Sequence, residues 1–179
     1  MTAPIFLLVG SPAVGKSTTA RALAAKFPKG IYIPVDDVRD MVVSGRVLPG
    51  PDWGDALIEQ LVLARESVTQ MALAYNKAGF AVAIDDFWDP VSQLAEYTPL
   101  FSLPQVCKVV LYPREEVAHA RNLKRSGGDM YIEEGIRFGY RNLNPVIATL
   151  RTQGWLVLDT TDLDVEASVS SILAFAEVK

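Results

Sequence analysis

Residues 10–17 match the complete pattern G-x-x-x-x-G-K-[ST]. An apolar run at residues 5–9 precedes the motif and is typical of a buried parallel strand, and a helical pattern follows it to about Phe27. The glycines at both ends permit backbone conformations in which successive N–H groups face one concavity and hold phosphate oxygens. This stretch therefore predicts a strand–loop–helix unit that binds a nucleotide phosphate.

The residues of this loop have separable roles. Lys16 supplies positive charge to the β- and γ-phosphates, and the Ser17 hydroxyl is placed to coordinate Mg²⁺. The helix that begins near Lys16 adds unpaired N–H groups and the positive end of its dipole. The predicted nucleotide-binding residues are Gly10, Ser11, Ala13, Val14, Gly15, Lys16, Ser17 and Thr18, the last mainly as a helix-start residue.

Strand and helix patterns alternate along the whole chain. Such alternation predicts an α/β fold with a mainly parallel sheet and an active site at the carboxyl ends of the strands. Pro34 indicates that the second strand lies at an edge of the sheet or is bulged. Strands are expected near residues 4–10, 31–35, 80–85, 106–112 and 155–159, with helices near 16–27, 37–44, 55–77, 90–100, 113–124, 132–143 and 165–176 and a separate helix from 144–145.

Composition narrows the class of protein. The chain has 179 residues, half of them hydrophobic, which predicts one domain over residues 1–179 with a sizeable core. No apolar run is long enough to cross a bilayer, and the first residues lack the basic region of a secretion signal. Cys107 alone cannot form an internal disulfide and is expected to be a buried thiol. We therefore expect a cytoplasmic protein without a membrane partner.

Charge bears on the choice of partner. The net charge of −4 and the pI near 5.0 argue against nucleic-acid binding through a broad basic surface. A small basic patch at an active site remains compatible with these values. The oligomeric state is left open between monomer and homodimer.

Three predicted strands end in acidic residues. Helix capping or turn formation would account for each of them alone, but their shared place beside a phosphate-binding loop favours catalysis. We predict that Asp36 is a general base and Asp37 the helix N-cap, with Asp37 as the alternative base. Asp85 is the second acid, which orients the acceptor or holds a metal-bound water, and Asp86 is its alternative. Asp159 is expected to shape the turn beneath the nucleotide base.

Arg121 and Arg125 are four residues apart and so share one helix face. They precede the Gly127-Gly128 break, which favours a lid over about residues 121–135 rather than a solvated basic face. Arginine suits the charge that develops on a transferred phosphoryl group. A second pair, Arg137 and Arg141, is expected on the surface.

Three other side chains are less informative. His119, the one histidine, is expected to be an exposed structural residue. Trp53 and Trp88 lie in or next to predicted loops on the acceptor side, where they either stack on a planar substrate or pack in the core.

In combination, these motifs resemble the small P-loop kinases of the AAA_33-like group, which includes polynucleotide 5′-hydroxyl kinase domains, chloramphenicol phosphotransferase and zeta toxins. The resemblance covers most of the chain in order, although only its motifs are specific. Residues 36–39, Asp-Asp-Val-Arg, resemble the D-x-x-R element of the group, and Arg121 to Arg125 resembles its R-x-x-x-R lid motif. The usual Asp-Thr-Asn after the third strand is here Asp-Asp-Phe at residues 85–87.

The resemblance implies a three-layer α/β P-loop NTPase fold, similar to nucleoside monophosphate kinases, with a five-stranded parallel sheet and a helical lid. It implies transfer of the γ-phosphate of ATP to a hydroxyl with Mg²⁺ as cofactor. Asp36 would be the base, Lys16, Arg121 and Arg125 the other catalytic residues, and Arg39 with Asp85 the substrate-binding residues.

The resemblance does not name the acceptor of the phosphate. The low pI and the lack of a basic tract favour a small molecule. The alternatives are a polynucleotide 5′-hydroxyl kinase and a non-catalytic ATP-binding regulatory module, with a toxin that acts on a nucleotide sugar as a fourth hypothesis.

Overall fold

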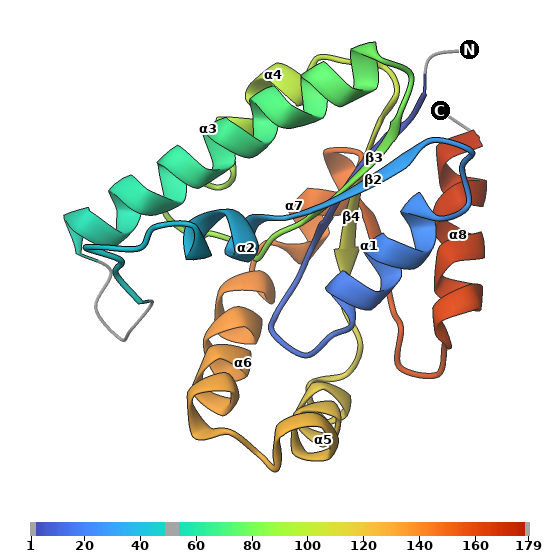
Figure 1. Cartoon of the computed structure of the whole chain (residues 1–179). Helices are drawn as coiled ribbons and strands as arrows, with labels where there is room; N and C mark the ends of the chain where they lie inside the picture. The colour runs from blue at the N-terminus through green and yellow to red at the C-terminus, as the bar shows by residue number, and fades with distance from the viewer. Residues whose placement is uncertain (1–2, 49–53, 178–179) are drawn as a thin grey trace.

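A computed structural model describes residues 3–48 and 54–177 and contains one sheet of five parallel strands in the order β2-β3-β1-β4-β5 (Figure 1). The predicted α/β class and parallel sheet are confirmed. Pro34 lies on β2 at an edge of the sheet, as predicted, because a proline there leaves no ladder hydrogen bond unmade. The strands are β1 (Ile5–Val9), β2 (Gly30–Pro34), β3 (Ala81–Asp85), β4 (Val106–Leu111) and β5 (Leu156–Leu158).

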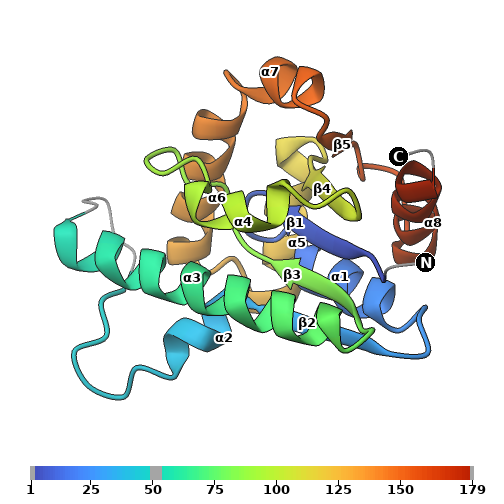
Figure 2. The same cartoon turned by 90° about the horizontal axis from the view of Figure 1, so that it is seen from above.

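Both faces of the sheet are covered by helices. Every residue of β1 is buried, and successive side chains enter different cores because side chains alternate along a strand. Ile5, Leu7 and Val9 pack with α3, α4 and α7, whereas Phe6 and Leu8 pack with α1, α6 and α8. Figures 1 and 2 show α3 and α8 on opposite sides of the molecule. The bounds are α1 (Lys16–Ala24), α3 (Asp55–Lys77), α4 (Thr98–Phe101), α6 (Met130–Leu143), α7 (Ile147–Thr152) and α8 (Val165–Glu177).

The helix expected near residues 37–44 begins earlier. The structure has α2 at Val35–Asp40, directly after β2. Its N-cap is Pro34, with φ −79° and ψ 123°, so the extended strand passes straight into the helix. The prediction that Asp37 is the N-cap is therefore wrong: Asp36 and Asp37 both lie in the first helical turn, where carboxylates favour the positive end of the helix dipole.

The helix expected over residues 90–100 is mostly absent. Its first half forms turns, and a short 3₁₀ helix, η1 (Ala95–Tyr97), leads into α4. The Asp89 carboxylate accepts the backbone N–H groups of Val91 and Ser92 at 2.7 and 3.3 Å, which offers the chain an alternative to helix formation. Gln93 and Leu94 then adopt positive φ angles of 50° and 65°, which a helix cannot contain.

The helices α5 (Glu115–Ser126) and α6 form a hairpin beyond the carboxyl ends of the strands, at the bottom of Figure 1. Gly127, with φ 71°, ends α5 in the left-handed conformation that favours glycine. The Asp129 carboxylate accepts the N–H groups of Tyr131 and Ile132 and so caps α6. This hairpin places Arg121 of α5 over the loop after β1.

The single cysteine and the apolar character of the helices were the subject of two predictions from composition. Cys107 is a buried thiol on β4, as predicted. In the described ranges, no helix is both long and apolar enough to span a membrane.

Candidate functional site

The phosphate-binding motif forms the connection from β1 to α1. Gly10 has φ 154°, and a Cβ atom there would lie 2.6 Å from the carbonyl oxygen of Leu111. Gly15 is left-handed, with φ 101°, and immediately precedes Lys16, the first residue of α1. A side chain at Gly10 would collide with β4, and one at Gly15 would be strained. The strand–loop–helix unit predicted from the motif is therefore present.

Helix α6 packs directly against this loop. The Ser11 hydroxyl is buried and donates a hydrogen bond of 3.2 Å to the carbonyl of Ile136. A Cβ atom at Gly139 would lie 2.6 Å from Ser11 Oγ and 3.0 Å from Ser11 Cα, so only glycine permits this approach. Sequence reasoning missed this contact. The available signal was a pair of glycines, Gly135 and Gly139, inside a helix. Glycine is unfavourable within a helix, so such a pair indicates a close packing contact.

Lys16 and Val14 show how the loop is held. Lys16 Nζ donates to the carbonyl of Ser11 at 2.9 Å, so the ammonium group folds back over the loop. The side chain of Val14 is buried in the core, which leaves only its backbone for contact with a ligand. The loop thus presents its backbone and one lysine charge to the solvent side.

Ser17 and Asp85 both lie near the phenol of Tyr32. The Tyr32 hydroxyl donates to Asp85 Oδ2 at 3.1 Å, and the Ser17 side chain lies within reach of the same hydroxyl. Burial, together with Asp85, raises the pKa of Tyr32 to about 12, so the phenol is a protonated donor at neutral pH. Asp85 is 8% exposed and pairs in register with Leu8 of β1, which places its carboxylate beside the start of the loop.

Oxygen ligands of this kind fit Mg²⁺. A hydroxyl and a carboxylate are hard donors, and Mg²⁺ in proteins usually keeps several waters and takes few protein ligands. Over residues 3–48 and 54–177, no three His, Cys, Asp or Glu side chains form a cluster that could hold a metal by themselves. Ser17 and Asp85 are therefore the residues that fit a magnesium ion bound together with phosphate oxygens.

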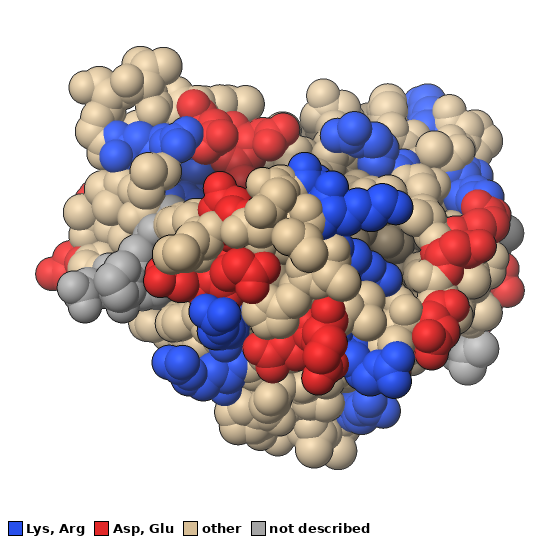
Figure 3. Space-filling model, turned by 90° about the horizontal axis from the view of Figure 1, so that it is seen from below, with Lys and Arg blue, Asp and Glu red and all other residues tan. Residues whose placement is uncertain are grey.

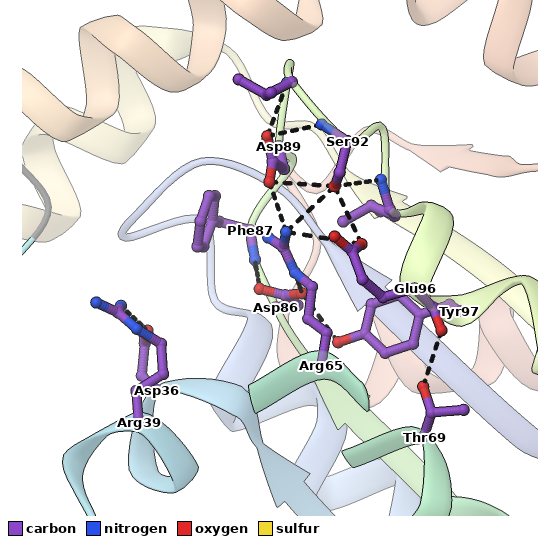
Figure 4. Close-up of polar contacts among 12 residues, drawn as sticks. Asp36, Arg39, Arg65, Thr69, Asp86, Phe87, Asp89, Ser92, Glu96 and Tyr97 are labelled. Carbon is purple, nitrogen blue, oxygen red and sulfur yellow. Dashed lines mark hydrogen bonds and ion pairs between the residues drawn. The ribbon is translucent and has the colours of Figure 1, made fainter. Parts of the chain in front are cut away.

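Asp36 and Arg39 stand one turn apart on α2. The Asp36 side chain is 76% exposed, whereas the Arg39 side chain is 7% exposed. Arg39 Nη1 lies 3.4 Å from Asp36 Oδ1, and Nη2 donates to the carbonyl of Val47 at 3.0 Å. Arg39 Nε is buried without a hydrogen-bond partner in the described part of the chain. Asp36 is thus accessible, and its neighbouring guanidinium is anchored in the protein. Figure 4 shows the two side chains together on α2.

Tyr131 lies at the start of α6. Burial raises its pKa, the charges of Arg39 and Arg46 oppose the rise, and Asp36 adds to it.

Asp86 is buried and forms its hydrogen bonds with Arg65 and Tyr97. Arg65 of α3 is fully buried; its Nε donates to Asp86 Oδ2 at 2.7 Å and its Nη1 to Asp89 Oδ2 at 2.5 Å. The Tyr97 hydroxyl donates to Asp86 Oδ2 at 2.9 Å (Figure 4). Burial lowers the pKa of Arg65, but the two carboxylates outweigh burial and raise the net value. We call these four residues the Arg65 network. Asp86, the alternative to Asp85, belongs to this network and is closed to solvent.

The two arginines of α5 differ in their surroundings. Arg121 Nη1 donates to the carbonyl of Val14 at 2.8 Å, and Nη2 donates to the carbonyl of Thr160 at 2.9 Å. Arg121 therefore ties the phosphate-binding loop to the turn after β5. Arg125, one turn further, is exposed and has no hydrogen bond or ion pair to any residue that the structure describes.

The turn after β5 is held by its own side chains. The Asp159 carboxylate accepts the Thr161 N–H at 2.9 Å, and the Thr161 hydroxyl accepts the Arg114 N–H at 2.8 Å. Hydrogen bonds from Thr161 lower the pKa of Asp159. As predicted, Asp159 shapes this turn.

The remaining candidates have structural surroundings. His119 is half-buried rather than exposed as expected, because its Nδ1 lies 2.5 Å from Glu133 Oε2, across the α5–α6 hairpin. Trp88 is buried and packs edge-on against Trp155, which confirms the core interpretation. Trp53 lies outside the described residues. Arg137 and Arg141 are exposed, as expected.

Charges of both signs alternate on the face that carries the loop and the hairpin. Figure 3 shows this face from below, with basic side chains bordering a hollow right of its middle and acidic side chains interspersed around it. The basic patch is local. This pattern differs from the continuous basic stripe that tracks a nucleic-acid backbone.

Comparisons with known proteins agree with this architecture. The family AAA_33, described as an AAA domain, matches residues 5–135. The fold is similar to a gluconokinase from Sinorhizobium meliloti 1021, with a TM-score of 0.68 and 15% identity over 99% of this chain and 93% of that chain. It is also similar to a shikimate kinase from Acinetobacter baumannii in complex with shikimate, with a TM-score of 0.67 and 17% identity over 99% of this chain and 94% of that chain.

A sugar kinase from Janibacter sp. HTCC2649 has a TM-score of 0.70 and 18% identity over 98% of this chain and 95% of that chain. At these identities, the structures show that the fold is shared, and the three-layer P-loop kinase fold predicted from the sequence is confirmed. A search of curated proteins found no match.

Proposed function

Because the chain belongs to the AAA_33 family, we propose that it is a kinase that transfers the γ-phosphate of ATP to a hydroxyl group of a small molecule. The observation that carries this proposal is the exposed carboxylate of Asp36. It stands two residues beyond Pro34, whose register partner is Asp85 next to the phosphate-binding loop. A kinase needs such an accessible carboxylate near the phosphates, and a nucleotide sensor does not.

In the proposed reaction, Asp36 accepts the proton from the acceptor hydroxyl as its oxygen attacks the γ-phosphorus. Arg39 orients Asp36 from its anchored position on α2. Lys16 and the backbone N–H groups of the loop hold the phosphates. When bound, Mg²⁺ would be held by the Ser17 hydroxyl, with Asp85 on its waters, and would neutralise charge on the phosphate oxygens.

In this proposal, Arg121 and Arg125 have different roles in stabilising the phosphate charge. Two backbone carbonyls hold Arg121 at the rim of the loop, so its charge acts on the bound nucleotide from a fixed place. Arg125 is exposed beside the Gly127-Gly128 break. Movement of the far end of the proposed lid (about residues 121–135), with Arg121 held in place, would carry Arg125 to the transferred phosphoryl group. A planar guanidinium suits that delocalised charge.

A small acceptor is supported by the mixed charge around Asp36. Asp40 pairs with Arg46 at 2.6 Å, and Asp37 follows Asp36 on the same turn, so acidic groups balance the basic ones there. A polynucleotide would meet carboxylates where it needs cations. The names of the similar structures, a gluconokinase, a shikimate kinase and a sugar kinase, also favour a small hydroxylated acceptor.

The test is a transfer assay with γ-labelled ATP against a panel of nucleosides, sugars, hydroxy acids, hydroxylated antibiotics and a single-stranded oligonucleotide. We expect label in one class of small molecule and none with the Asp36→Asn variant, which controls for contaminating kinases. Label only in the oligonucleotide would replace the proposal with a polynucleotide 5′-hydroxyl kinase. Confirmed ATP binding with no labelled acceptor would favour a regulatory module.

A further inference from the structure

Tyr32 stands between two residues to which the proposed function gives separate roles. It lies on the edge strand β2, and its side chain packs on the sheet face that α1 covers. Its hydroxyl donates to Asp85 Oδ2 at 3.1 Å and contacts the Ser17 side chain. The Arg21 guanidinium, from the next turn of α1, lies 5.0 Å from the centroid of the phenol ring. The Arg21 guanidinium thus covers the phenol ring, while the hydroxyl points to Asp85.

Asp85 depends on this contact. It is 8% exposed, and within the described residues the Tyr32 phenol is the single hydrogen-bond donor to its carboxylate. A carboxylate has about four sites that accept hydrogen bonds, so a buried one with one donor is under-satisfied. Asp86, the next residue, shows the opposite case, with donors from Arg65, Tyr97 and the Phe87 N–H. Asp85 therefore keeps accepting capacity for a further donor, such as a metal-bound water.

We propose that Tyr32 is a positioning residue that holds the Asp85 carboxylate at the start of the phosphate-binding loop, where it serves the magnesium end of the proposed site. This inference rests on the proposed function, since it concerns the metal that such a reaction uses. The phenol acts through Asp85, in the way that hydrogen-bond partners of metal ligands set their orientation.

The matched variants are Tyr32→Phe and Tyr97→Phe. Each removes one phenol hydroxyl and keeps the ring, and each removes a donor from an aspartate, Asp85 in the first case and Asp86 in the second. In Tyr32→Phe the ring contact with Arg21 remains, so the fold is preserved. The melting temperature of each variant checks this.

The experiment measures ATP affinity by calorimetry as a function of Mg²⁺ concentration, with EDTA as the metal-free reference. We expect Tyr32→Phe to need about tenfold more Mg²⁺ for half of its gain in ATP affinity, a typical loss when a partner of a metal ligand is removed. Its affinity for metal-free ATP should be unchanged. Tyr97→Phe should keep the wild-type Mg²⁺ requirement, and Asp85→Asn should raise that requirement at least as far as Tyr32→Phe.

Two results would overturn the inference. A wild-type Mg²⁺ requirement in Tyr32→Phe, with a raised one in Asp85→Asn, would show that Asp85 needs no positioning by the phenol. A wild-type requirement in Asp85→Asn would remove Asp85 from the metal end altogether. Both are binding measurements, so they stand apart from failure of the proposed function, which is a lack of transfer by the wild-type protein.

Transfer kinetics add a second readout. If a labelled acceptor is found, excess Mg²⁺ should restore transfer by Tyr32→Phe, because the variant lacks only metal affinity. The same excess should leave Asp36→Asn inactive, because that variant lacks the base. Equal failure of rescue in both variants would contradict a positioning role for Tyr32.

Discussion

Two neighbouring strands end in aspartates with opposite surroundings. After β2, Asp36 is 76% exposed and has one ion pair, at 3.4 Å from Arg39. After β3, Asp86 is 1% exposed and lies 2.7 Å from the buried Arg65. Figure 4 shows the Asp36–Arg39 pair set apart from the Arg65 network. The difference shows that a carboxylate at the carboxyl end of a strand stays accessible only where the next element leaves it exposed and few hydrogen-bond donors surround it.

The two connections explain this difference. After β2, the chain enters α2 at once and turns the Asp36 side chain towards solvent. After β3, residues 86–94 form an irregular connection under α3 that has buried polar groups to satisfy. Arg65 supplies the positive charge for Asp86 and Asp89, and removal of one partner from such a group leaves an uncompensated buried charge.

The largest expected effect is on activity at Asp36. Asp36→Asn should lower kcat about 10²- to 10⁴-fold, the usual contribution of a general base, because the amide cannot accept the proton of the acceptor. The melting temperature and the ATP affinity should stay at their wild-type values, since the carboxylate is exposed. The control is Asp37→Asn on the same helical turn. Loss of transfer in Asp37→Asn with normal transfer in Asp36→Asn would assign the base to Asp37.

The next effect is on stability at Arg65. Arg65→Met should lower the free energy of unfolding by about 3–5 kcal/mol, because Asp86 and Asp89 stay buried without their cation. Urea denaturation measures this loss. Arg46→Met is the matched control: its partner Asp40 is exposed, so the change should stay below about 1 kcal/mol. Equal losses in the two variants would break the contrast between buried and exposed carboxylates.

A smaller effect is expected at Tyr97. Tyr97→Phe removes one donor from Asp86 and leaves the Arg65 contact in place. We expect a loss of about 1 kcal/mol in the free energy of unfolding, the usual net value of one hydrogen bond. The loss is read from urea curves on the same scale as Arg65→Met. A loss as large as that of Arg65→Met would mean that the phenol, and not the guanidinium, carries the network.

The smallest effect concerns Glu133, a half-buried carboxylate that is hydrogen-bonded across the α5–α6 hairpin. Bonds from Asn122 and His119 lower its pKa below the ordinary value of 4.5. A lowered pKa in the folded state gives stability that is present above the unfolded value and is lost as pH falls through the folded value. The α5–α6 contact should therefore persist through pH 4.5 and weaken below it. The NMR shift of the Asn122 side-chain amide should titrate below pH 4.5, and Glu133→Gln should abolish that step.

Much of the fold follows from local sequence pattern. The helix predicted over residues 55–77 is observed at Asp55–Lys77, because its apolar stripe repeats with the period of a helix and Gly79 ends it. The five strands were recognisable as short apolar runs between turn residues. The helix expected over residues 90–100 did not form, because the Asp89 carboxylate accepts the N–H groups of Val91 and Ser92 and so outweighs the local helix propensity.

The candidate site likewise has one part that the sequence predicts and another that only the tertiary structure shows. The sequence by itself determined the phosphate-binding loop, with its glycines and Lys16, and the acids that follow the strands, because each is a short pattern with a backbone consequence. Only the tertiary structure decided which acid stays open and which is buried. Arg65 donates a hydrogen bond to Asp86, Tyr32 donates one to Asp85, and Gly139 packs against Ser11, each across a long separation in the chain. No local periodicity encodes such contacts, since they arise only when strands and helices pack and bring distant side chains together.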